Sequence, residues 1–156
     1  MLRNSLFFAG AWAAAVAGCS SDSSAPACNT LTDDGPTITL MAVVGQAPTP
    51  AGGTVVDGTY VLAATTLYTA ATTMIPPTTS SAVIQIAGST MQQVGLINGQ
   101  EKRYTSTFTV TGTTVATTDT CPAPSMGSHQ YTATTTELRI YDSATIGTLE
   151  QKYAKR

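Results

Sequence analysis

The chain has 156 residues, with seven Lys and Arg against nine Asp and Glu, and a formal net charge of -2 at pH 7. That balance excludes a basic surface for nucleic acid, and we expect no nucleic-acid partner. All thirty threonines lie after residue 18, and threonine favours half-exposed strands over helix interiors. Cys28, Cys121 and the lone His129 do not supply four ligands at any familiar spacing, so we expect no metal and no cofactor.

Residues 1–18 have the composition of an export signal. Arg3 stands in a short head without acids, an apolar run extends from about Leu6 to Val16, and small residues follow. This run is shorter than the roughly 20 apolar residues that a membrane-spanning helix needs. It ends in the polar sequence that begins at Cys19, so the segment is expected to be removed rather than to span a membrane.

The run Val16-Ala17-Gly18-Cys19 resembles the bacterial lipobox. The resemblance implies that the Cys19 thiol carries a diacylglycerol, that cleavage makes Cys19 the new N-terminus, and that acyl chains such as palmitate anchor the protein. Two or more chains hold a protein on a bilayer without a spanning segment. Ser20 stands where an Asp commonly retains such proteins in the inner membrane. An outer-membrane lipoprotein of the cell envelope is therefore expected.

The rest of the chain is expected to form a flexible Ser-rich tether over residues 19–36 and one β domain over residues 37–156. If Cys19 is lipidated, Cys28 and Cys121 remain, and in an oxidising compartment such a pair favours a disulfide over two buried thiols. The bond would place the Cys121 loop nearest the membrane and present the opposite end of the domain outward.

Runs of strand-forming residues bounded by Gly, Pro, Asn and Ser predict short strands joined mostly by tight turns. The pair Asn98-Gly99 is the strongest hairpin signal, because both turn residues must adopt positive φ. Without helical periodicity between the strands, the pattern favours a small antiparallel up-and-down barrel of about eight strands, or alternatively a β-sandwich. The predicted strands cover residues 37–44, 59–69, 82–87, 90–97, 100–110, 113–119, 129–135, 137–142 and 147–153.

Gly58-Thr59-Tyr60 opens a strand, the Asn98-Gly99 hairpin follows, and the chain ends in a basic tail. This arrangement resembles small lipid-anchored bacterial proteins of lipocalin-like type, in which a tryptophan usually stands in the place of Tyr60. The resemblance implies an up-and-down barrel that holds one small apolar ligand. It also implies a basic residue over Tyr60, for which Arg139 and Lys152 are the candidates.

The inventory of reactive residues argues against an enzyme. The chain has no Gly-x-Ser-x-Gly elbow, His-Glu-x-x-His helix or P-loop. His129 is the sole imidazole and is expected at the surface or in a structural hydrogen bond. Acids such as Glu101, Glu137 and Glu150 are expected in solvent, although two carboxylates that meet across a cleft stay an open alternative.

Two functions from different classes remain. The first is a structural or interaction lipoprotein with a protein partner, and the second is a carrier of a small apolar molecule. An interior void of several hundred Å³, the size of small-molecule sites, would favour the carrier. The candidate lining residues are Tyr60, Leu62, Tyr104, Phe108 and Tyr131.

Overall fold

The computed structural model describes residues 28–72 and 74–156. The predicted export signal, Cys19 and the Ser-rich segment up to residue 27 lie outside these residues. The described part of the chain contains strands and no helix, and thus no helix that could cross a membrane.

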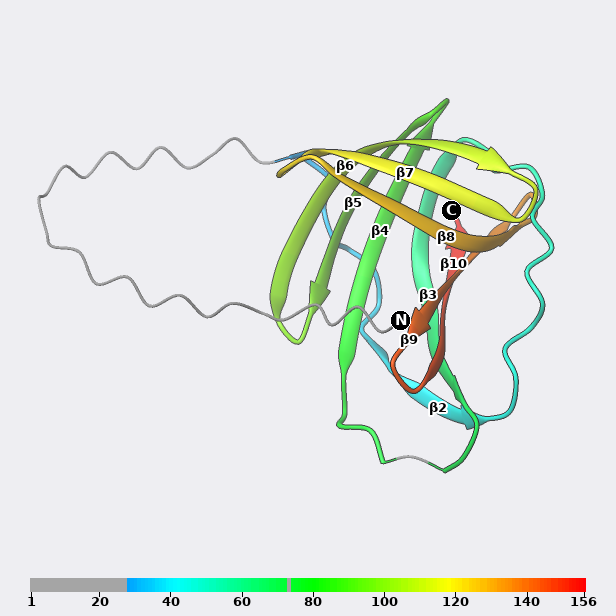
Figure 1. The fold of residues 1–156 in the computed structure, drawn as a ribbon. Helices are drawn as coiled ribbons and strands as arrows, with labels where there is room; N and C mark the ends of the chain where they lie inside the picture. The colour runs from blue at the N-terminus through cyan, green and yellow to red at the C-terminus, as the bar shows by residue number, and fades with distance from the viewer. Residues whose placement is uncertain (1–27, 73) are drawn as a thin grey trace, which may run out of the picture.

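Eight strands form a closed antiparallel barrel (Figure 1). From β3 to β10, each strand pairs with the next along the chain, including β3 with β4. The pairing of β10 with β3 then closes the ring. The prediction of an all-β up-and-down barrel is confirmed, and the alternative β-sandwich is wrong. The eight strands are β3 (Gly58–Thr69), β4 (Thr79–Ala87), β5 (Thr90–Ile97), β6 (Gln100–Thr111), β7 (Thr114–Cys121), β8 (Ser125–Ala133), β9 (Glu137–Ala144) and β10 (Gly147–Lys155).

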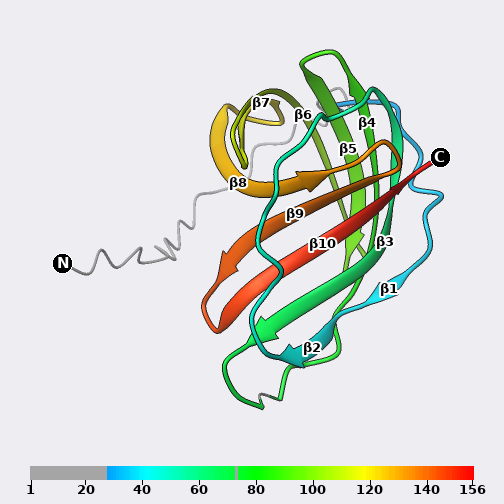
Figure 2. The same ribbon diagram turned by 90° about the vertical axis from the view of Figure 1, so that its right-hand side faces the viewer.

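Two further strands, β1 (Ile38–Thr39) and β2 (Met41–Val44), lie where β3 and β4 separate (Figure 2). Gly58–Val61 of β3 pairs with the end of β4, whereas the rest of β3 and the beginning of β4 do not pair with each other. β1 pairs antiparallel with β4, and β2 pairs parallel with β3. The single strand predicted over residues 37–44 is therefore divided, because its two halves pair with different partners.

The tight turns follow the sequence. Asn98 and Gly99 have φ angles of 50° and 79°, as the predicted hairpin between β5 and β6 requires. Two boundaries differ from the prediction by three residues or more, because strand pairing extends beyond the run of strand-forming residues. β8 begins at Ser125, which pairs with Asp119, and β4 begins at Thr79, which pairs with Thr39.

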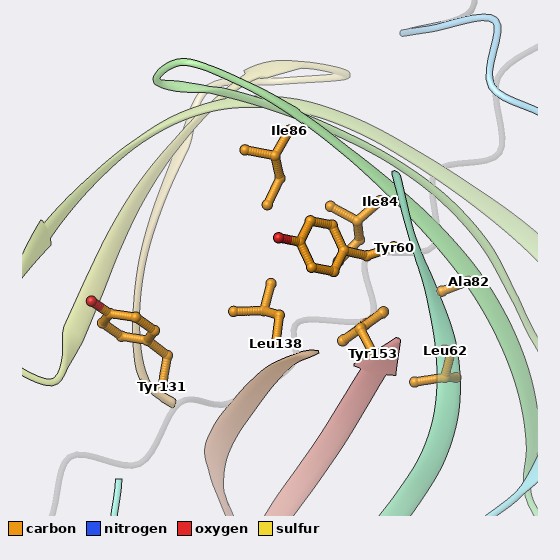
Figure 3. Packing of buried hydrophobic residues seen from close by; sticks show 8 residues of the cluster. All are labelled: Tyr60, Leu62, Ala82, Ile84, Ile86, Tyr131, Leu138 and Tyr153. Carbon is orange, nitrogen blue, oxygen red and sulfur yellow. The ribbon is translucent and has the colours of Figure 1, made fainter. Parts of the chain in front are cut away.

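One end of the barrel is filled by large apolar side chains (Figure 3). Tyr60 extends from β3 toward Ile86 on β4 and Leu138 on β9. All three are at most 5% exposed. Burial on this scale contributes roughly 1.5 to 3 kcal/mol for each large side chain, which makes this cluster the main apolar core of the fold.

Residues 52–56, which we call the cap segment, lie across this filled end. The Tyr60 hydroxyl donates to the Val56 carbonyl at 2.6 Å, and the Tyr131 hydroxyl donates to the Gly53 carbonyl at 2.7 Å. Gly52 and Gly53 both have positive φ, and a Cβ on either would lie within 2.5 Å of a backbone carbonyl oxygen. The sequence Gly-Gly is thus what lets the loop approach the barrel so closely.

Residues 28–36, predicted as part of the tether, instead pack against the outer face of the barrel. The Asn29 side-chain amide donates to the carbonyls of Gln93 and Tyr104, on adjacent strands β5 and β6. Arg103 donates back to the Asn29 and Leu31 carbonyls. The folded unit therefore begins by Cys28, ahead of the predicted boundary at residue 37.

The basic residue over Tyr60 is Lys155, not Arg139 or Lys152. The Lys155 ammonium lies 6.0 Å from the Tyr60 ring centroid, within the range of a cation–π contact. Its stem passes over Gly58, where a Cβ would lie 2.4 Å from the Lys155 Cε. Arg139 and Lys152 both pair with Glu137.

The disulfide between Cys28 and Cys121 is present, with 5.4 Å between the two Cα atoms. It joins the start of the folded unit to the last residue of β7. The Cys28 carbonyl also accepts a hydrogen bond from the Thr105 hydroxyl on β6 at 2.7 Å. The bond therefore fixes where the preceding segment leaves the barrel.

Because this bond closes a loop over a sequence separation of 93 residues, the Cys28→Ser/Cys121→Ser double variant should lose up to about 4 to 5 kcal/mol of unfolding free energy in the chain-entropy model. Urea unfolding followed by far-ultraviolet circular dichroism measures the loss. Wild type with a reductant should behave as the double variant does. An unchanged midpoint in both samples would contradict a stabilising bond.

Candidate functional site

The barrel encloses a cavity of about 420 Å³, a volume within the range of small-molecule sites. Of the five predicted lining residues, Tyr104, Phe108 and Tyr131 line this cavity. Tyr60 and Leu62 are instead buried in the apolar cluster, where they help to fill the capped end. The interior is thus partly packed and partly open.

The inner part of the cavity is apolar. It is lined by side chains from the capped end of β4, β6, β7, β8, β9 and β10, and Val55 of the cap segment closes it. Several of these side chains are almost fully buried, so this end is shut to solvent. The apolar lining includes Ile86, Phe108, Val115, Tyr131, Leu138, Ile140 and Tyr153.

The opposite end of the cavity is polar and open. Asp119, Ser125, His129 and Asp142 line it. Ser125 is exposed, and the adjacent Met126 is 88% exposed. These residues lie near the turn between β7 and β8, which marks the mouth of the cavity.

Asp119 is held by two serine hydroxyls. Ser106 on β6 donates to Oδ1 at 2.6 Å, and Ser125 on β8 donates to Oδ2 at 2.5 Å. Two hydrogen bonds of this kind fix the orientation of the carboxylate. No cation is paired with Asp119 among the ion pairs of the described residues.

His129 on β8 forms a pair with Asp142 on β9. Its Nδ1 lies 2.5 Å from Asp142 Oδ1, so Nδ1 carries the proton and donates to the carboxylate. This hydrogen bond raises the pKa of His129 above its usual value, and the negative charges of Asp142 and Asp119 act in the same direction, while partial burial opposes them. The imidazolium is favoured at the mouth, and the other ring nitrogen, Nε2, has no partner in these contacts.

Gly127 makes room for this arrangement. A Cβ at Gly127 would lie 2.7 Å from Thr117 Oγ1 and 2.9 Å from His129 Nε2. Residue 127 faces inward between Ser125 and His129, because side chains alternate along a strand. Any larger residue here would displace the histidine ring or the threonine.

Polar groups without a protein partner also face the interior. The side chains of Gln93, Tyr104 and Gln151 line the cavity, and none makes a side-chain hydrogen bond to another described residue. Thr65 pairs directly with Gln151 across β3 and β10, so both point to the same face. The Thr65 residue is 7% exposed, and its hydroxyl oxygen has no hydrogen-bond partner in the described structure. Unpaired buried polar groups are unfavourable, so these positions favour a polar ligand atom or water.

Glu150 was expected in solvent but is only 4% exposed. Its side chain is on the outside of the barrel and accepts hydrogen bonds from the Tyr68 hydroxyl at 2.9 Å and from Arg139 at 3.1 Å. Both carboxylate oxygens are thereby satisfied, which is what allows burial of the charge. Glu150 therefore supports the sheet and does not belong to the cavity.

Asp119, Asp142 and the two serines were not among the site residues predicted from the sequence. A signal for both acids exists in the strand alternation. Asp119 shares a face with Val115, and Asp142 shares a face with Leu138 and Ile140. In each strand, a charged residue ends a row of apolar residues on the inward face. This pattern indicates an interior that is apolar at one end and polar toward its opening.

In comparisons with known proteins, no family model, no curated protein and no solved structure matches the chain.

His129 is the one histidine of the chain, so its imidazole signal can be assigned without ambiguity in a proton NMR titration. We expect a His129 pKa above its ordinary value in the wild type and a lower pKa in Asp142→Asn, which loses the charged acceptor. The folded-state pKa is raised, so the stability from this pair is present below the unfolded pKa of about 6.5 and is lost as pH rises through the folded pKa. Equal pKa values in the two proteins would contradict the pairing.

Proposed function

We propose that this protein is a lipid-anchored lipoprotein of the cell envelope that carries a small, mainly apolar molecule inside its barrel. The observation that supports the carrier over a purely structural role is the cavity of about 420 Å³. A barrel of eight strands can be filled completely by its own side chains or can hold one small ligand. Here the lining changes from apolar at the closed end to polar at the mouth, as a site for a molecule with an apolar body and one polar end would require.

Lipid attachment at Cys19 would set the orientation of the barrel. Cys28 is bonded to Cys121, two residues after Asp119 and beside the mouth. Only eight residues separate Cys19 from Cys28, and a flexible linker of that length would span roughly 15 Å. The mouth would therefore lie close to the membrane, and a ligand could exchange directly with the lipid phase.

A catalytic role has less support. His129 and Asp142 form a pair of the kind found in acid–base sites. Neither oxygen of Asp119 is free of a serine hydroxyl, however, and the described contacts place no nucleophile on His129 Nε2. We therefore propose a binding function without chemistry.

Thr117→Phe should obstruct the cavity, because Thr117 is 8% exposed and faces the interior from the middle of β7. Binding of prodan, a small neutral dye whose emission responds to apolar surroundings, should weaken by at least about tenfold, a loss of roughly 1.4 kcal/mol. Fluorescence titration of the full chain with Cys19→Ala as the common background measures the affinity without a lipid anchor.

The matched control is Thr118→Phe, which places the same ring one position along the strand on the exposed outer face. It should bind prodan as the background protein does. Absence of saturable prodan binding in the background protein, or equal binding in Thr117→Phe, would overturn the carrier proposal.

Replacement of Cys19 by Ala tests the anchor separately. The variant should leave the membrane fraction or retain its export signal, because the acyl chains provide the attachment. Cell fractionation and intact-protein mass spectrometry together report both outcomes. A Cys19→Ala protein that stays with membranes at the acylated mass would show that lipidation lies elsewhere.

A further inference from the structure

We propose that the molecule carried in the barrel bears a cationic amine at its polar end, and that Asp119 binds this amine at the mouth of the cavity. This inference rests on the proposed carrier function. It concerns the charge of the ligand, which the size of the cavity does not determine.

The charges that face the cavity favour a cation. Asp119 and Asp142 are its acids, His129 is the one basic group, and no Lys or Arg is among the described lining residues. Two carboxylates and one imidazolium sum to minus one, and a neutral imidazole leaves minus two. Asp142 already holds His129 in an ion pair, whereas Asp119 has no ion pair with any described residue. In a partly desolvated site such a charge attracts an opposite charge and repels a like one.

The contacts of Asp119 leave room for a further donor. Each carboxylate oxygen accepts one serine hydroxyl, whereas an ionised carboxylate has about four lone-pair positions. An ammonium brings three donors. The unpaired side chains of Gln93, Tyr104 and Gln151 can accept those that Asp119 does not.

The unsatisfied hydroxyl of Thr65 adds an unpaired polar group on the inward face of the barrel, next to the lining residue Gln151, although Thr65 does not itself line the cavity. It is nine-tenths buried, lies on the inward face beside Gln151, and belongs to a strand on the other side of the barrel from Asp119. A hydrogen bond from a ligand or from an accompanying water would satisfy it. Asp119 is thus one of several polar groups on the inward face of the barrel that could accept a hydrogen bond from a ligand.

The same arrangement disfavours a fatty acid. Its carboxylate would lie beside Asp119 and Asp142, and among the lining residues only His129 could compensate it. That imidazole is already bound to Asp142 through Nδ1. A neutral alcohol would suffer no repulsion but would gain no ion pair.

Displacement of prodan by three amphiphiles of equal chain length tests the inference. Decylamine, decanol and decanoate differ in the charge of the head group at pH 7, and each is used below the concentration at which it forms micelles or separates from solution. On the full chain with Cys19→Ala, decylamine should displace the dye at a concentration at least about tenfold lower than decanoate, the ratio expected for one charged hydrogen bond. Decanol should fall between them.

Asp119→Asn keeps the shape of the side chain and removes its charge, so it should weaken decylamine by about tenfold and leave decanol unchanged. Glu101→Gln removes one negative charge from an exposed position on β6, outside the cavity, and should change none of the three affinities. Circular dichroism confirms that each variant is folded. The preference of the unsubstituted protein for decylamine over decanoate does not depend on any variant.

The outcomes separate the two proposals. If neither prodan nor any of the amphiphiles binds, the carrier function is wrong. If decanoate binds as tightly as decylamine, or if Asp119→Asn and Glu101→Gln weaken decylamine equally, the carrier stands and the amine inference is overturned.

Discussion

Closure of the barrel by β3 is the constraint on which the rest of the structure depends. This strand pairs along nine positions with β10 and, at Gly58–Val61, with β4. The pairing of β10 with β3 shifts register between Lys152 and Tyr153. Such a bulge bends a strand, and this one lies next to the part of β3 that also pairs with β4. Without this double pairing, the eight strands would form an open meander and the apolar side chains at the capped end would face water. The cavity exists because the ring is closed and its interior is only partly filled.

The segments outside the ring stabilise its two ends differently. The cap segment closes the apolar end through hydrogen bonds from two buried tyrosines, each contributing about 0.5 to 1.5 kcal/mol. Residues 28–36 cover β5 on the outer face, where Val94 is fully buried. The disulfide fixes the first of these residues, Cys28, beside the mouth. The cavity is thus closed at its apolar end, and the disulfide holds residues 28–36 beside its polar mouth.

Local signals were sufficient for much of the fold. Asn98-Gly99 fixed one hairpin by its required φ angles, and strand alternation placed Tyr104 and Phe108 on the inward face. Long-range pairing decided what those signals could not, such as the division of residues 37–44 between β4 and β3 and the choice of Lys155 over Arg139 for Tyr60. The polar mouth was missed because Asp119 and Asp142 lie on different strands and meet the same cavity only after the barrel closes.

The central claim, an anchored carrier with an occupied barrel, is tested most directly by native mass spectrometry of the protein purified from its own membrane. The account predicts a chain that begins at the acylated Cys19 and retains one small molecule, which collisional activation releases as a cation. An unmodified Cys19 would contradict it, and so would a protein that carries no bound molecule in any preparation after extraction in a mild detergent.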